Sequence, residues 1–178
     1  MAKIKWTMDP THSEIQFKVR HLMITNVTGS FGRFAAEVET EGDDIETASI
    51  KFTAEIDSIT TNNGQRDAHL KSADFFDAAN YPELVFTGRG LKKIKEEEYE
   101  LSGDLTIRGT KKPVKLKVEH GGIIKDPWGN TRTGFTVEGK INRKEFGLVW
   151  HATTETGGLV VADEVRMHAS VEFIQDKP

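Results

Sequence analysis

Alternation of apolar and polar residues at every second position is the feature that most constrains the fold of this chain. Residues 50–57 read IKFTAEID, and residues 101–108 read LSGDLTIR. Because successive side chains of a β-strand point to opposite faces, this period of two predicts strands with one buried and one solvated face. Such strands are typical of antiparallel sheets, so the chain is predicted to be all-β.

The alternation recurs often enough to predict about eight strands. Consecutive strands joined by short turns favour an extended up-and-down antiparallel barrel, with residues 1–178 forming a single domain. Phe31 and Phe34 are out of phase by one residue, which predicts a bulge at Gly32. The predicted strands lie near 15–23, 31–39, 48–60, 84–91, 99–108, 113–119, 133–142 and 164–174, and predicted turns include Asn26–Gly29, Glu41–Asp44, Gly109–Lys112, Asp126–Gly129 and Gly157–Gly158.

One stretch between the third and fourth predicted strands departs from the alternation. It reads SITTNNGQRDAHLKSADFFDAANYPELVF over residues 58–86. Asn62 or Asn63 can cap a helix over Gly64–Phe76, and the Tyr81-Pro82 step then returns the chain to an extended strand. A second, short helical turn is predicted at Arg143–Leu148.

The helical connection is predicted to cover part of the barrel. Phe75 and Phe76 are both expected to dock inward, because each Phe left in water forfeits about 1.5–3 kcal/mol of burial. Arg66 and Asp67 are expected to pin the segment to the barrel through polar contacts, with Asp67 as the partner of Arg66.

Composition and charge exclude several classes of protein. The chain has no Cys, which rules out disulfides and Cys-based catalysis, and its net charge is −4. Lys and Arg are scattered among acidic residues, which argues against nucleic-acid binding, and no apolar run is long enough to span a membrane. The N-terminal residues show no signal peptide, so a cytoplasmic location is expected, or a periplasmic one if a signal was removed.

Strand parity assigns a set of side chains to the barrel interior. His21 is either a core histidine with a hydrogen-bond partner or a polar anchor in an apolar pocket. Gly88, Gly103, Gly139 and the alanines Ala54 and Ala169 share this face, and they either bend the strands or leave room for a ligand. The residues proposed to contact a ligand are Phe17, Val19, His21, Phe52, Phe86, Leu105, Ile107, Phe135 and Met167.

Signatures of catalysis or metal binding are sparse. The chain has neither a nucleophile elbow nor a phosphate-binding loop. Asp9 and His12 are two possible metal ligands without a third. His69 near Arg66 and Asp67 could form an acid-base cluster, but ion pairing or capping by these residues is the simpler interpretation. No catalytic residue, metal or cofactor is therefore predicted.

Several stretches together resemble the YceI-like family of bacterial lipid-binding proteins. They are DPTHSEIQFKVRHLMITNVTGSF, the segment at 58–86, GDLTIRGTKKPV, DPWGNTRTGFTVEGKINRKEFGL and the final strand. The resemblance covers Trp6 to about Phe173 and implies an extended lipocalin-like barrel with a helix between two strands. The family's RDxHLxSxxFF pattern falls on Arg66, Asp67, His69, Leu70, Phe75 and Phe76.

The resemblance also implies a function. Family members bind long apolar molecules, such as polyisoprenoids, in an internal tunnel, they have no established catalytic activity as a class, and they often form homodimers. The leading hypothesis is non-enzymatic binding, transport or storage of a polyisoprenoid or isoprenoid quinone, with this lipid as the sole ligand. The alternatives are an enzyme acting on an apolar substrate through His21 or the Arg66-Asp67-His69 group, and a structural barrel whose interior is packed.

Overall fold

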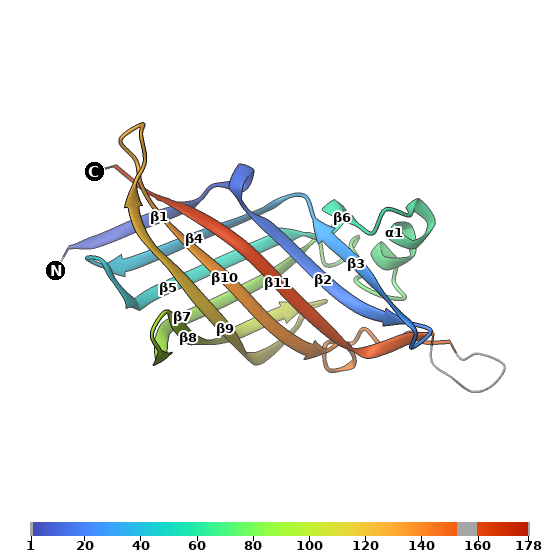
Figure 1. Ribbon diagram of the computed structural model, residues 1–178. Helices are drawn as coiled ribbons and strands as arrows, with labels where there is room; N and C mark the ends of the chain where they lie inside the picture. Colours follow the sequence, from blue (N-terminus) through green and yellow to red (C-terminus); the bar gives the residue numbers. More distant parts are fainter. Residues whose placement is uncertain (1, 153–159, 178) are drawn as a thin grey trace.

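The computed structural model describes residues 2–152 and 160–177 and shows an antiparallel sheet closed into an elongated barrel (Figure 1). A helix, α1 (Gly64–Lys71), and three 3-10 turns, η1 (Pro10–His12), η2 (Ile56–Ser58) and η3 (Arg143–Phe146), interrupt the strands. The strands are β1 (Lys3–Met8), β2 (Glu14–His21), β3 (Thr25–Phe31), β4 (Phe34–Glu41), β5 (Asp44–Glu55), β6 (Ile59–Thr60), β7 (Glu83–Lys95), β8 (Glu98–Ile107), β9 (Thr110–Lys125), β10 (Thr131–Asn142) and β11 (Val161–Gln175).

Eight strands close the barrel in the order β1-β4-β5-β7-β8-β9-β10-β11, and β11 returns to β1. The closing contact pairs Trp6 with Gln175 and Met8 with Phe173. The remaining strands prolong this barrel: β2 follows β1 and pairs with β11, β3 leads into β4, and β6 follows β5 and pairs with β3. The predicted eight-stranded antiparallel barrel with a helical connection is confirmed.

One prediction for the N-terminal part of the chain is wrong. Asn26–Gly29, predicted as a turn, lies inside β3, and β1 precedes the eight main strands that the alternation predicts. The turn falls at Leu22–Ile24, where Leu22 and Met23 have positive φ angles of 54° and 61°. Gly and Asn normally occupy such backbone, so large apolar residues gave no turn signal. The turn predicted at Gly157–Gly158 lies outside the described residues.

The break between β3 and β4 is a two-residue bend at Gly32 and Arg33 rather than the predicted bulge. The Gly32 N–H donates a hydrogen bond to the carbonyl oxygen of Ser58 at 3.0 Å, which holds the bend against η2. The bend restores the phase of the alternation, so Phe31 and Phe34 both pack into the hydrophobic core.

Helix α1 begins at Gly64, as predicted. Its N-cap is Asn63, whose side-chain oxygen accepts a hydrogen bond from the Arg66 N–H at 3.1 Å. It ends at Lys71 rather than Phe76, because the Ser72 hydroxyl donates to the His69 carbonyl oxygen at 2.6 Å and the chain continues as turns. The predicted second helical turn is η3.

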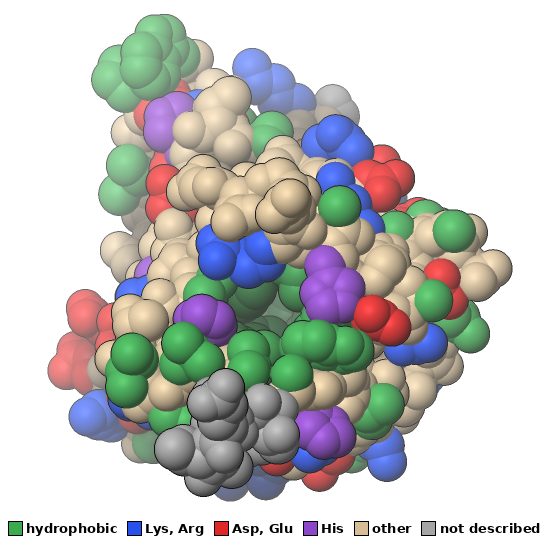
Figure 2. Space-filling view, turned by 90° about the vertical axis from the view of Figure 1, so that its right-hand side faces the viewer, with side chains coloured by type: hydrophobic (Ala, Val, Ile, Leu, Met, Phe, Trp, Pro, Cys, Tyr) green, Lys and Arg blue, Asp and Glu red, His purple; other side chains and the backbone are tan. Residues whose placement is uncertain are grey.

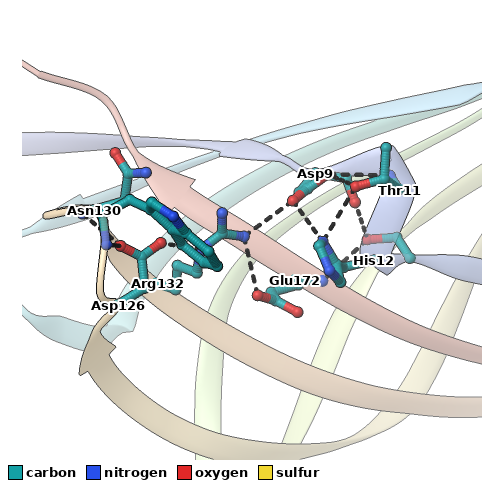
Figure 3. A network of polar contacts seen from close by, with 9 residues as sticks. Asp9, Thr11, His12, Asp126, Asn130, Arg132 and Glu172 are labelled. Atoms are coloured by element: carbon teal, nitrogen blue, oxygen red, sulfur yellow. Dashed lines mark hydrogen bonds and ion pairs between the residues drawn. The ribbon is translucent and has the colours of Figure 1, made fainter.

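A cluster of charged side chains joins η1, β11 and the turn between β9 and β10 (Figure 3). The Arg132 guanidinium donates to Asp126 at 2.6 Å, to Asp9 at 2.9 Å and to Glu172 at 3.1 Å. Hydrogen bonds from Thr11, His12 and Arg132 hold the pKa of Asp9 well below its usual range. The hydrogen bond from Arg132 lowers the pKa of Asp126.

Replacing Arg132 with Met is expected to make the unfolding temperature less sensitive to acid. A carboxylate whose folded pKa is depressed stabilises the fold above its unfolded pKa, about 3.9 for Asp, and this contribution is lost as the pH falls through the folded pKa. The unfolding temperature of Arg132→Met should therefore lie below that of the unmodified protein at pH 6–7, and the difference should shrink below about pH 4.

Thermal unfolding followed by circular dichroism between pH 2.5 and 7 measures this difference. Arg166→Met is the control, because Arg166 also lies on the sheet but its ion pair with Glu164 is exposed. A difference for Arg132→Met that stays constant with pH would contradict the assignment.

Candidate functional site

The barrel encloses a cavity of about 600 Å³ that extends along its interior. Figure 2 shows its opening at the α1 end, a hollow rimmed by hydrophobic side chains with basic and histidine side chains beside them. We call this opening the mouth. The lining contributed by the strands is almost entirely apolar, and the polar lining residues are found mainly on α1, at the end of β2 and on η3.

The structure places all nine residues predicted from strand parity on the cavity wall. They come from six strands, β2, β5, β7, β8, β10 and β11, so the wall is continuous around much of the barrel. Contact of these residues with a ligand stays a prediction. His21 is the last residue of β2 and lies on the wall beside Arg20 near the mouth.

Aromatic rings line the part of the cavity below α1. The ring centroids of Phe17 and Phe31 are 5.8 Å apart, and those of Phe31 and Phe76 are 6.5 Å apart with an edge-on geometry. Such pairs contribute about 0.5–1.5 kcal/mol beyond their buried area and have defined orientations. The wall at this end is therefore a preorganised apolar surface.

The interior glycines do not leave open space for a ligand, contrary to one of the two sequence interpretations. A Cβ at Gly88 or at Gly103 would overlap the ring of Phe86, and a Cβ at Gly139 would overlap Leu116. A Cβ at Gly29 would likewise overlap the ring of Phe17. Each glycine thus accommodates a large neighbouring side chain that itself lines the cavity. Ala54 is buried but does not line the cavity, whereas Ala169 does.

Helix α1 is fixed to the barrel through Thr61, which follows β6 and is buried. Asp67 accepts hydrogen bonds from the Thr61 N–H at 2.8 Å and from its hydroxyl at 2.6 Å. Arg66 donates to the Thr61 hydroxyl and to its carbonyl oxygen, both at 2.7 Å. The predicted pinning role is thus observed, but the expected Arg66–Asp67 pair is wrong: both side chains bind Thr61 instead.

Phe75 and Phe76 both line the cavity, as expected from their position after the helix. Phe75 is buried. Its ring centroid lies 5.3 Å from that of Trp150 and 5.1 Å from that of His69. The Arg108 guanidinium donates to the Phe75 carbonyl oxygen at 3.0 Å and holds this turn against the barrel.

His69 lies at the mouth and pairs with Asp74, not with Asp67. Its Nε2 is 2.9 Å from Asp74, and its ring meets that of Trp150 edge-on at 4.8 Å. The acid-base cluster of His69 with Arg66 and Asp67, the less favoured of the two interpretations, does not form, because Arg66 and Asp67 both bind Thr61.

Arg143 is a residue of the cavity wall that the sequence interpretation did not single out. Its side chain is 2% exposed and donates to the carbonyl oxygens of Leu148, Trp150 and Ala162 at 2.6–2.9 Å. Burial lowers the pKa of its guanidinium, and the charge of Asp163 opposes this. The sequence predicts a helical turn over the NRKEF stretch, but a lone Arg gives no signal that distinguishes a buried side chain from an exposed one.

The possible metal pair Asp9 and His12 lies in the Arg132 cluster, away from the mouth. His12 Nδ1 is 2.8 Å from Asp9, which also binds Arg132. Among residues 2–152 and 160–177, no group of three or more His, Asp or Glu side chains is arranged to hold a metal ion. In the same described part, no helix is long and apolar enough to cross a membrane.

Comparison with known proteins assigns the chain to a family. The YceI-like domain family matches residues 6–173. The chain belongs to this family. A UPF0312 protein of Staphylococcus epidermidis is 40% identical over 175 residues, 97% of this chain and 98% of that protein. A UPF0312 protein of Staphylococcus aureus is 38% identical over 171 residues, 94% of this chain and 96% of that protein.

Solved structures share the barrel. A YCEI protein of Campylobacter jejuni is 34% identical with a TM-score of 0.77, covering 89% of this chain and 90% of that one. BcnA of Burkholderia cenocepacia is 22% identical with a TM-score of 0.80, over 93% and 98% of the two chains. A polyisoprenoid binding domain from Saccharophagus degradans is 13% identical with a TM-score of 0.66, over 96% and 98%. The latter two likenesses concern the fold alone.

Replacing Asp67 with Ala is expected to destabilise the protein by about 1–3 kcal/mol, because it leaves the buried Thr61 N–H without its acceptor. Urea unfolding measures the loss. Asp74→Ala is the matched control, since it removes a carboxylate of the same segment whose ion pair with His69 is exposed. Equal losses in the two variants would show that Thr61 does not hold the helix.

Replacing Gly103 with Ala is expected to cost about 1–3 kcal/mol of stability through overpacking. A Cβ there would collide with the backbone carbonyl oxygen of Thr87 and with the ring of Phe86. Gly139→Ala is the comparison, because the closest obstacle there is the end of the flexible Leu116 side chain. Thermal unfolding that ranks Gly139→Ala as the more damaging change would contradict this account.

Proposed function

We propose that this protein binds one long-chain apolar lipid of the polyisoprenoid type inside the barrel, as a carrier or store that performs no chemistry on it. The observation that carries the proposal is the cavity, which is lined by apolar side chains from most strands and opens at a mouth with polar neighbours. Its volume falls within the range of about 300–1,000 Å³ that is usual for small-molecule sites.

The lining favours a ligand that is apolar along most of its length. Each CH₂ group moved from water into such a wall contributes about 0.8 kcal/mol, so a long chain gains affinity without directional contacts. Polar lining residues near the mouth, among them His21, Asn63 and His69, are placed where a polar head group would remain close to water.

A polyisoprenoid is the class that relatives suggest. The domain from Saccharophagus degradans that shares the fold is described as polyisoprenoid-binding. Branched isoprene units suit a wall built from Phe, Leu, Ile and Val side chains, and an isoprenoid quinone would present the same tail with a polar ring at the mouth.

The two alternative functions have less support. Catalysis would need a nucleophile or a metal beside His21 or His69, and the carboxylate that His69 contacts lies on the exposed side of its own segment. A structural barrel with a packed interior would leave no room, whereas the cavity of about 600 Å³ is present.

The test is to fill the cavity at one position. Ala169 lies on the wall, and Ala169→Phe is expected to weaken binding of geranylgeraniol at least about tenfold, because the ring occupies the volume that the ligand needs. Ser170→Phe is the control, since this neighbouring side chain is exposed. Titration calorimetry gives the affinities, and thermal unfolding checks that both variants are folded.

Unchanged affinity in a folded Ala169→Phe variant would rule out binding inside the barrel. Recovery of the alcohol, its diphosphate and its esters unchanged after incubation is expected for a carrier. Turnover that is lost in His69→Ala would instead establish the enzymatic alternative.

A further inference from the structure

The turn between β2 and β3 exposes three consecutive apolar side chains. Leu22 is 39% exposed, Met23 47% and Ile24 78%. Scattered single apolar residues are ordinary on protein surfaces, but a contiguous group at the tip of a hairpin is not. Their exposure calls for a partner with apolar chemistry.

The backbone conformation of this turn does not suit the residues that form it. Leu22 and Met23 have φ angles of 54° and 61°. In this left-handed region the backbone of residues other than Gly, Asn and Asp is strained. Asn or Gly would form the hairpin more easily, so folding alone does not account for Leu and Met here.

The turn lies at the mouth of the cavity. It directly follows His21, which lines the wall, and the Leu22 N–H donates to the Val160 carbonyl oxygen at 2.8 Å. The Val160 N–H in turn donates to the Ala152 carbonyl oxygen at 3.1 Å. The exposed Val149 lies in that segment between Leu148 and Trp150, which both line the cavity.

The tip of the hairpin carries only positive charge. Residues 16–28, which include the Leu22–Ile24 turn, contain Lys18 and Arg20 and no Asp or Glu. Asp163 and Glu164 of the neighbouring strand β11 are paired with Lys144 and Lys140. The Arg20 guanidinium donates to the Met23 carbonyl oxygen at 2.7 Å, which keeps a positive charge at the apolar tip. Apolar side chains beside basic ones match the chemistry of a membrane interface with anionic head groups.

The opposite end of the barrel provides a contrast. Ile124 and Trp128 are exposed near the hairpin of β9 and β10, and no residue from 119 to 134 lines the cavity. Arg20 and His21, which adjoin the Leu22–Ile24 turn, do line it. That hairpin carries Asp126, which is tied into the Arg132 cluster. Exposed apolar groups at the two ends therefore differ in charge environment and in their relation to the cavity.

We propose that the Leu22–Ile24 turn docks the protein on an anionic lipid bilayer, with the mouth facing the membrane surface. The apolar tip enters the interfacial layer, and Lys18 and Arg20 meet the anionic head groups. An apolar ligand then passes between bilayer and cavity with little exposure to water. The docking rests on the turn itself, and its role in ligand transfer rests on the proposed function.

Vesicle sedimentation tests the docking. The probes are vesicles of phosphatidylcholine alone and of phosphatidylcholine with one quarter phosphatidylglycerol. The unmodified protein is expected to sediment with the anionic vesicles and less with the neutral ones. The variant Leu22→Asn/Met23→Asn/Ile24→Ser should lose about tenfold or more in partitioning, because the apolar groups that enter the interface are gone.

Two further variants make the result decisive. Ile124→Ser/Trp128→Ser removes exposed apolar groups from the far end and should sediment like the unmodified protein. Ile24→Ser alone spares the two strained positions and should give a partial loss. No vesicle binding by the unmodified protein, or equal losses for both ends, would overturn the proposal, as would concentration-dependent self-association through this turn instead of lipid binding.

A separate readout distinguishes failure of the docking from failure of the proposed function. Geranylgeraniol affinity measured without vesicles should be the same for the turn variant and the unmodified protein, whereas transfer of the alcohol between vesicles should slow about tenfold in the variant. Normal affinity with unchanged transfer would overturn the docking role and leave the carrier function standing. Absence of affinity in both proteins would remove the carrier function, while vesicle sedimentation would still decide the docking.

Discussion

The pairing of β11 with two partners along one edge is the constraint on which the rest of the structure depends. Its C-terminal part pairs with β1 at Met8, and most of its length pairs with β2 from Glu14 to His21. This edge closes the sheet, so apolar side chains of alternate positions converge on one interior. Closure also leaves the ends of the barrel as the routes to that interior, and α1 covers part of one of them (Figure 1).

The interior keeps its cavity because large side chains are held against the wall. Phe17 lies over Gly29, and Phe86 lies over Gly103, so each ring rests where a Cβ would otherwise stand. Each ring lies against the neighbouring strand, which leaves space inside the barrel. The Arg143 guanidinium lies on the wall, but it donates its hydrogen bonds to the backbone carbonyl oxygens of Leu148 and Trp150.

Much of the fold was predictable because alternation is a local signal. The parity of Phe52, Leu105 and Phe135 followed directly from their neighbours, and the structure places these side chains on the cavity wall. The helix cap at Asn63 was predictable for the same reason, since a capping side chain binds a backbone N–H only three residues further on.

The errors lie where a distant contact or an unusual backbone decides the outcome. Thr61 is the shared partner of Arg66 and Asp67, and nothing in its own sequence neighbourhood distinguishes it from Thr60. The turn at Leu22 and Met23 was missed because its backbone contradicts the preferences of its residues. Burial of Arg143 depends on its contacts with Leu148, Trp150 and, in β11, Ala162, which periodicity does not encode.

The attachment of α1 through Thr61 has a consequence for the kinetics of ligand exchange. Four hydrogen bonds fasten the helix to the strand that precedes it, so the cover moves with the barrel rather than swinging open. Under the proposed function, a long-chain lipid would leave by sliding along its own length through a fixed opening. Each additional CH₂ held inside would multiply its equilibrium retention roughly fourfold, so its residence time would increase with chain length.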